Sequence, residues 1–263
     1  MLPNFSYPVY TVVCPQSKYT YDVRCLVVGD EDRLLQSSTF AYSVLDNINK
    51  VIWSCIVNKP DHITDFNAFL ANTTQKDRDA FVYSILQASD EDKQVIDVTC
   101  AYCGTKQTVE VSLESCFNAN IYPGEPGEMI NNVVDVNVEL KNHIVNAKLK
   151  VPTLAKEKEI FYHFGQRNLP LHVLTLLLHI SELNIIDKKI DKPVQEAKIL
   201  PDIEATLVPL PHKVRRKLTK AISDNFAQYG MNLQYKFFCS KPDCGKENIH
   251  ELDVTDLLFR TII

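Results

Sequence analysis

Two short cysteine motifs lie far apart in the chain and supply the residue type that binds zinc most readily. The first reads Cys100-Ala-Tyr-Cys103-Gly104, and the second reads Cys239-Ser-Lys-Pro-Asp-Cys244-Gly245. Four thiolates suit a tetrahedral zinc ion, and a site closed by four protein ligands leaves no open position for water, so its role is structural. The sequence therefore predicts one structural zinc ion that joins two distant segments. Its four predicted ligands are Cys100, Cys103, Cys239 and Cys244.

Three alternatives to this zinc site stay open. The four-residue gap between Cys239 and Cys244 is less diagnostic of zinc than a gap of two, so both motifs could be tight turns without metal. His250 could complete a site of only three cysteines. A thiol of low pKa in the first motif would instead indicate a redox enzyme. Thiol titration with and without a chelator separates a redox thiol from a zinc site, because metal-bound thiolates react only after chelation.

No pattern of residues indicates a catalytic site. The seven histidines show no spacing that pairs one of them with a cysteine or serine nucleophile. The chain also lacks the Gly-x-Ser-x-Gly, phosphate-loop and His-Glu-x-x-His motifs. We expect the remaining cysteines to be small buried hydrophobic residues, namely Cys14, Cys25, Cys55 and Cys116. The sequence thus predicts a protein that is not an enzyme, with no catalytic residues and no cofactor besides zinc.

The residues around each motif predict a β-hairpin that carries the cysteines at its turn. A strand-like stretch precedes each motif, Val95–Thr99 before the first and Tyr235–Phe238 before the second. The glycine after each second cysteine can adopt positive φ, so the backbone can turn tightly around a metal. A helix from Thr74 to about Ala88 precedes the first hairpin, and Asp77 gives its start the pattern of a capping box.

The two motifs occupy corresponding places in a predicted internal repeat. Residues 74–85 match residues 211–222 at an offset of 137, and the cysteine motifs match at offsets of 139 and 141. The offset drifts in one direction, as small insertions in a diverged duplication would produce. We expect an α+β fold of two diverged repeats, each with a β-hairpin, helices and a zinc-ribbon-like cysteine hairpin. The expected units are residues 1–117, a linker at 118–132 rich in Pro, Gly and Asn, and residues 133–263.

Periodicity predicts the other elements. An apolar face that runs from Leu34 to Cys55 indicates one long helix, and alternation indicates a hairpin before it, in residues 9–14 and 19–28. In the second half the pattern predicts strands at 133–140 and 144–151 and helices at 154–164, 171–183, 211–229 and 254–262. A mixed-charge stretch at 187–192 indicates an exposed loop or a strand edge.

Composition narrows the function classes. The 263 residues carry a net charge of −5, which argues against nonspecific binding to nucleic acid or anionic lipid. We expect no secretory signal, and the richest apolar run, Leu169–Ile180, is too short to span a bilayer. Eight cysteines without an export signal favour reduced thiols in a cytoplasm. The basic cluster from His212 to Lys220 predicts an amphipathic helix whose cationic side is solvated or meets an acidic partner.

Several of these segments resemble a known family. They are Tyr7–Tyr10, Tyr21–Leu35, Asp77–Phe81 and Val98–Gly104. In them the chain resembles the baseplate hub and hub-assembly proteins of T4-like contractile-tailed bacteriophages, over roughly its first 120 residues. The resemblance implies a non-enzymatic phage tail protein, made in the host bacterial cytoplasm, that contacts other hub proteins and can form oligomers. It implies either a component of the virion baseplate or a factor that assembles the hub.

A second class of function stays open, that of a zinc-ribbon adaptor in phage transcription or replication machinery. Such adaptors usually carry a basic or aromatic face near the ribbon. The flanks of the two motifs are instead acidic, at Asp90, Glu91, Asp92, Glu110, Glu114 and Glu251. This charge makes nucleic-acid binding the weaker interpretation.

Overall fold

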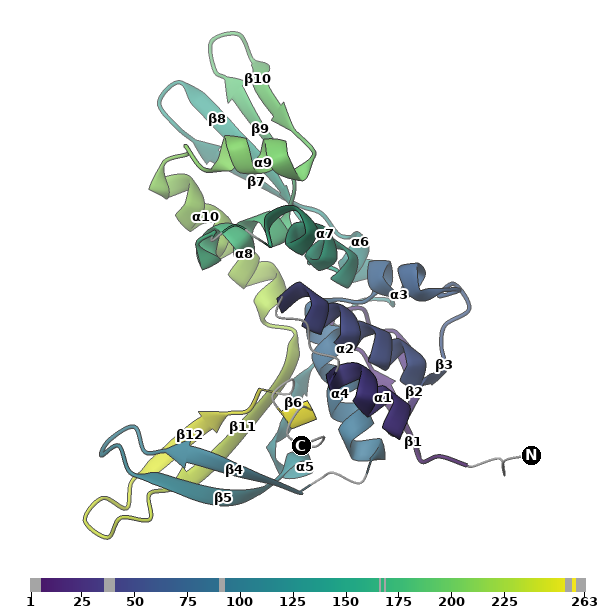
Figure 1. The fold of residues 1–263 in the computed structure, drawn as a ribbon. Helices are drawn as coiled ribbons and strands as arrows, with labels where there is room; N and C mark the ends of the chain where they lie inside the picture. The colour runs from purple at the N-terminus through teal and green to yellow at the C-terminus, as the bar shows by residue number, and fades with distance from the viewer. Residues whose placement is uncertain are drawn as a thin grey trace.

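Helices and small antiparallel sheets build the protein around two hydrophobic cores (Figure 1). The computed structural model describes residues 6–35, 41–89, 93–165, 167, 169–253 and 257–258. This architecture confirms the predicted α+β class. Of the helices in those ranges, none has the length and apolar character needed to cross a membrane.

The N-terminal sheet forms as its alternating residues predict. Strands β1 (Val9–Val13) and β2 (Thr20–Arg24) make the expected hairpin, and β3 (Ile56–Asn58) pairs with the other edge of β2. One face of this sheet packs against helix α4 (Gln75–Ala88). Its fully buried side chains are Val12, Tyr21 and Val23.

The predicted long helix is wrong, because two helices occupy that stretch. Helix α1 (Val28–Leu35) and helix α2 (Ala41–Cys55) pack against each other, which one continuous straight helix cannot do. Both helices turn apolar residues toward the same core, among them Leu34 and Ile52, so their apolar spacing reads as one stripe in the sequence. Residues 36–40, between them, lie outside the described part of the chain.

Helix α4 begins at the predicted capping box. The Thr74 hydroxyl accepts a hydrogen bond from the amide of Asp77, and the Asp77 carboxylate accepts one from the amide of Thr74. The same carboxylate accepts the amides of Gln16 and Ser17 from the turn between β1 and β2. Short helix α3 (Phe66–Asn72) precedes α4. The buried Asp77 therefore fixes both the start of α4 and the adjacent β-turn.

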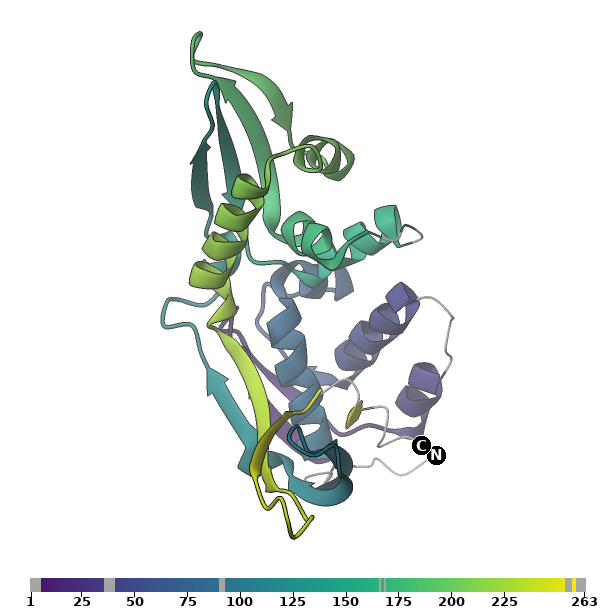
Figure 2. The same cartoon turned by 90° about the vertical axis from the view of Figure 1, so that its left-hand side faces the viewer.

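The two cysteine hairpins are present and lie side by side (Figures 1 and 2). Strands β4 (Lys93–Thr99) and β5 (Lys106–Ser112) form the first, and β11 (Gly230–Phe238) and β12 (Glu247–Glu251) form the second. Helix α5 (Leu113–Cys116) follows the first hairpin. The predicted closing helix at 254–262 falls almost entirely outside the described residues.

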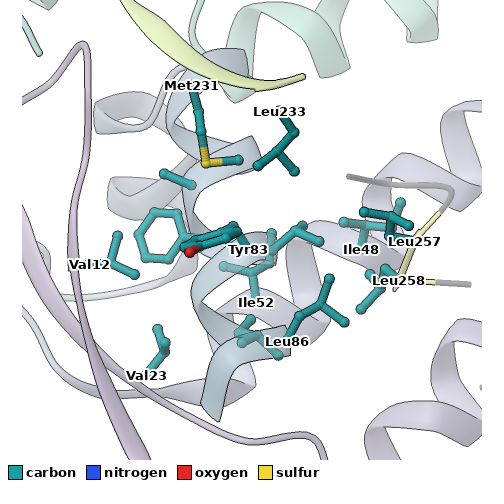
Figure 3. Close-up of a cluster of buried hydrophobic side chains, with 14 of the residues drawn as sticks. Val12, Val23, Ile48, Ile52, Tyr83, Leu86, Met231, Leu233, Leu257 and Leu258 are labelled. Carbon is teal, nitrogen blue, oxygen red and sulfur yellow. The ribbon is translucent and has the colours of Figure 1, made fainter. Parts of the chain in front are cut away.

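Strand β11 ties the C-terminal part of the chain to the first core. Its first half pairs with β6 (Phe117–Asn120), and its second half pairs with β12. Met231 and Leu233 of this strand point into the cluster formed by the N-terminal sheet and helices α2 and α4 (Figure 3). Leu257 and Leu258 join the same cluster.

A four-stranded sheet and its helices enclose the second core. The strand order is β10-β9-β8-β7. The strands are β7 (Val134–Glu139), β8 (His143–Leu149), β9 (Ile180–Asp187) and β10 (Lys192–Ala197). The helices are α6 (Glu128–Asn131), α7 (Leu154–Phe164), α8 (Leu171–His179), α9 (Leu200–Leu207) and α10 (His212–Ile222). Helices α8, α9 and α10 cover the apolar side of the sheet.

Three details of this half differ from the sequence-based expectation. Helix α8 ends at His179 because the following residues begin β9, in which Ile180 and Leu183 are buried. Helix α9 and strand β10 were not expected, and the mixed-charge stretch forms the exposed turn that leads into β10. The helix expected at 211–229 is α10 followed by a π-helical turn at Ser223–Ala227.

Each half of the chain runs through its elements in a similar order. From β1 to β5 the chain forms a hairpin, two helices, a strand that pairs with the hairpin, two more helices and a cysteine hairpin. The same order recurs from β7 to β12, where β10 is an additional strand. The first core takes residues from both halves, because β11 packs into it. The duplication and the unit boundaries at 117, 118–132 and 133 stay predictions.

Candidate metal centre

The turns of the two cysteine hairpins bring the four predicted ligands together. Cys100 and Cys103 lie in the turn between β4 and β5, and Cys239 and Cys244 lie in the turn between β11 and β12. The four Sγ atoms all lie within 4.8 Å of one another. Residues separated by more than a hundred positions in sequence thus form one cluster of thiols.

The spacing of the sulfurs fits a tetrahedral zinc site and not a disulfide. The Sγ atoms of Cys100 and Cys244 are 3.8 Å apart, and those of Cys103 and Cys239 are 3.6 Å apart. A tetrahedron with zinc–sulfur bonds of about 2.3 Å has sulfurs about 3.8 Å apart. A disulfide needs about 2.0 Å, and all four cysteines are free. Both of these sulfur pairs connect one hairpin to the other, so a metal here would join the hairpins.

Matching backbone hydrogen bonds shape the two turns. The amide of Cys100 donates to the Thr105 carbonyl at 2.9 Å, and the amide of Gly104 donates to the Cys100 carbonyl at 2.9 Å. In the second turn the amide of Cys239 donates to the backbone carbonyl of Lys246, and the amide of Gly245 donates to the backbone carbonyl of Lys241. Both turns therefore direct their cysteine side chains toward the same point.

The glycine in each turn has the predicted positive φ. The φ angle is 70° at Gly104 and 52° at Gly245. A Cβ atom at either position would meet no atom within 4 Å, so space does not require glycine there. Left-handed backbone, which costs other residues free energy, is the physical reason for glycine at these positions.

Hydrogen bonds to the sulfurs favour thiolates in the first turn. The Thr105 hydroxyl and amide lower the pKa of Cys103 to about 6. At Cys100 burial opposes ionisation, but the amides of Tyr102 and Cys103 and the side chain of Asn248 outweigh it and lower the pKa. These bonds stabilise negative charge on sulfur, which is the form that binds metal.

In the second turn, burial and the neighbouring thiols disfavour the thiolate form of Cys239. The amide of Lys241 lowers the pKa of Cys239, but burial and the neighbouring thiols outweigh it and raise the pKa to about 11. Further thiolates therefore need a positive charge between them. A divalent metal ion supplies that charge and permits all four thiolates near neutral pH.

Asn248 connects the two turns beside the sulfurs. Its side-chain oxygen accepts the amide of Ala101 at 2.9 Å, and its side-chain nitrogen donates to the Lys246 carbonyl at 2.9 Å and to Cys100 Sγ at 3.5 Å. The residue is 6% exposed. Sequence reasoning missed Asn248, because an asparagine at the start of a strand after a turn carries no distinctive signal. Such partners orient ligands and tune metal affinity.

Gln107 holds the two hairpins together without metal. Its side-chain nitrogen donates to the Phe238 carbonyl at 3.0 Å, and its side-chain oxygen accepts the amide of Ser240 at 2.7 Å. One glutamine thus satisfies two backbone groups at the end of β11, as a neighbouring strand would. This contact prearranges the thiols before any metal binds.

The alternative ligand and the remaining cysteines lie apart from this cluster. His250 is paired with Tyr235 in the middle of the β11–β12 ladder and is not among the grouped ligands. Cys14, Cys55 and Cys116 are buried, as predicted, whereas Cys25 is partly exposed. Burial and then the nearby Asp77 charge raise the pKa of Cys14, which makes that thiol unreactive.

Comparison with known proteins identifies a family. A family model described as T4 bacteriophage base plate protein matches residues 7–260. No curated protein and no solved structure matches the chain. The match extends the resemblance seen in the N-terminal segments to nearly the whole chain, and it includes both cysteine hairpins.

Proposed function

The chain belongs to the T4 bacteriophage base plate protein family, and from this premise we propose that it serves the hub of the baseplate without catalysing a reaction. It acts there through contacts with other hub proteins and can assemble into an oligomer. The match over residues 7–260 is the observation that carries this proposal. The protein is made in the host bacterial cytoplasm and acts during tail assembly, as a component of the virion baseplate or as a factor that builds the hub.

The proposed role of the thiol cluster is structural. One zinc ion held by Cys100, Cys103, Cys239 and Cys244 closes the site with protein ligands and leaves no position for a reacting water. The sulfur distances and the hydrogen bonds from Asn248 support this assignment. Such an ion would fix the C-terminal hairpin against the N-terminal half, so that protein contacts form on a rigid scaffold. It would also join the two units of the proposed duplication.

Fractionation of phage-infected cells tests the proposed function. Quantitative mass spectrometry would compare the amount of this protein in purified tails, in baseplate precursors and in the unassembled pool. A fixed number of copies in finished tails identifies a component, and presence only in precursors identifies an assembly factor. Absence of the protein from both the purified tails and the baseplate precursors would contradict the proposal. Co-purification with RNA polymerase or replication proteins would instead favour a zinc-ribbon adaptor.

A further inference from the structure

A groove that shares no lining residue with the thiol cluster combines an apolar floor with a cationic rim. We name it the α8–α10 groove. It consists of two adjoining hollows of about 460 and 570 Å³, which share His172 and Arg215 as lining residues. Residues of helices α8, α9 and α10 line it, together with the segments that adjoin these helices. The floor residues are Leu169, Val173, Leu176, Leu207, Val208 and Leu210.

The floor of the groove keeps apolar surface in contact with water. Val208 is 61% exposed, and Leu169, Val173 and Leu210 are only partly buried. Leu176 and Leu207 are buried below them and belong to the second core. Exposed apolar surface gathered in a concave site and bordered by polar residues is typical of an interaction surface.

Unpaired cations border this floor. Arg215, Arg216 and Lys220 lie on α10, and within the described part of the chain no carboxylate forms an ion pair with any of them. The other charged residues of the groove offset little of this positive charge. Arg167 and Glu204 neutralise each other through two hydrogen bonds of 2.8 and 2.6 Å, and Asp224 is a single anion at the far end.

We propose that the α8–α10 groove binds an acidic, amphipathic peptide segment of a partner protein. The apolar side chains of the segment would enter the larger hollow, and its carboxylates would meet Arg215, Arg216 and Lys220. Opposite charge on the two surfaces selects the partner and speeds association, while apolar contact supplies most of the affinity. The proposal goes beyond the baseplate assignment, because it names a surface and the chemistry of its occupant, and it does not depend on metal.

A protein segment fits the groove better than a nucleic acid does. Among the described residues that line the larger hollow, none is Phe, Tyr or Trp, the side chains on which bases most often stack. The chain as a whole is acidic, with a net charge of −5, so it repels a long phosphate backbone outside this patch. A short acidic segment avoids that repulsion.

Selection from a random library of 16-residue peptides displayed on messenger RNA tests the proposal on the full-length protein. Enriched peptides should carry net negative charge with apolar residues at helical spacing. Their affinity, measured by fluorescence anisotropy, should fall at least tenfold with Arg215→Glu/Arg216→Glu. It should also fall with Val208→Asp, which tests the floor at an exposed position. The matched control Lys106→Glu/Lys236→Glu makes the same charge change on exposed strand residues of the cysteine hairpins and should leave affinity unchanged.

Three results would overturn the proposal. One is enrichment of neutral or basic peptides, and another is no enrichment over a selection on Arg215→Glu/Arg216→Glu. The third is a protein that enriches no acidic peptide but binds a 16-nucleotide single-stranded DNA, when Arg215→Glu/Arg216→Glu abolishes that DNA binding.

Discussion

The junction between the two cores depends on a buried ion pair, and removing one partner should destabilise the protein strongly. The guanidinium of Arg78 on α4 forms two hydrogen bonds to the carboxylate of Glu157 on α7, which also accepts one from Gln75 at 2.6 Å. The two charged side chains are 10% and 5% exposed. The amide of Leu154 also donates to the Thr73 carbonyl at 2.8 Å, so the starts of both helices meet here.

Arg78→Met would leave the Glu157 carboxylate buried with only a neutral partner. Loss of one member of a buried pair costs about 3–5 kcal/mol. For a chain of this size that corresponds to a fall in Tm of roughly 6–20 °C, which differential scanning calorimetry would measure. The double variant Arg78→Met/Glu157→Met should recover most of the loss, since a well-packed apolar pair can replace a buried ion pair. A loss below about 1 kcal/mol, typical of an exposed pair, or a double variant no more stable than Arg78→Met, would refute this reasoning.

Three further predictions concern single side chains. Asn248→Ala should lower metal affinity about 10- to 100-fold in a chelator competition, because Cys100 loses its hydrogen-bond donor; unchanged affinity would contradict that role. Gly104→Ala should lower the free energy of unfolding, measured with urea, by about 1–2 kcal/mol, because alanine is strained at the φ of 70° found there. Gly29→Ala, also in open space but without positive φ, should change it little. Burial raises the pKa of Asp79 to about 6, so the folded state binds the proton more tightly and stability falls as pH rises from about 4 to 6. Asp79→Asn should remove this fall and stabilise the protein at pH 7 by on the order of 3 kcal/mol. The same pH profile in the variant would exclude Asp79 as its source.

Local chemistry in the sequence accounts for much of the fold. Turn glycines, strand alternation and the capping residues Thr74 and Asp77 act through neighbours a few positions away, so they predict the hairpins and the start of α4 correctly. The approach of the two cysteine motifs is also predictable, because four cysteines in two tight turns suggest a common ligand.

Other features depend on contacts that sequence spacing does not encode. The stripe from Leu34 to Cys55 keeps helical spacing across the junction of α1 and α2, so it hides the fact that the helices fold back on each other. Helix α8 ends at His179 because pairing of the next residues, from Ile180 onward, with β8 outweighs the helix propensity of the leucine-rich run. Asn248 and Gln107 act across hairpins more than a hundred residues apart, and no local pattern distinguishes them from ordinary strand residues.

Metal analysis of the purified full-length protein tests the zinc-joined scaffold most directly. Inductively coupled plasma mass spectrometry should find one zinc ion per chain in the native protein and none in Cys239→Ser, which removes one sulfur of the cluster. Cys25→Ser is the matched control, since that free thiol lies outside the cluster, and it should retain the ion. A native protein without metal, or a Cys239→Ser variant with unchanged zinc content, would contradict the account.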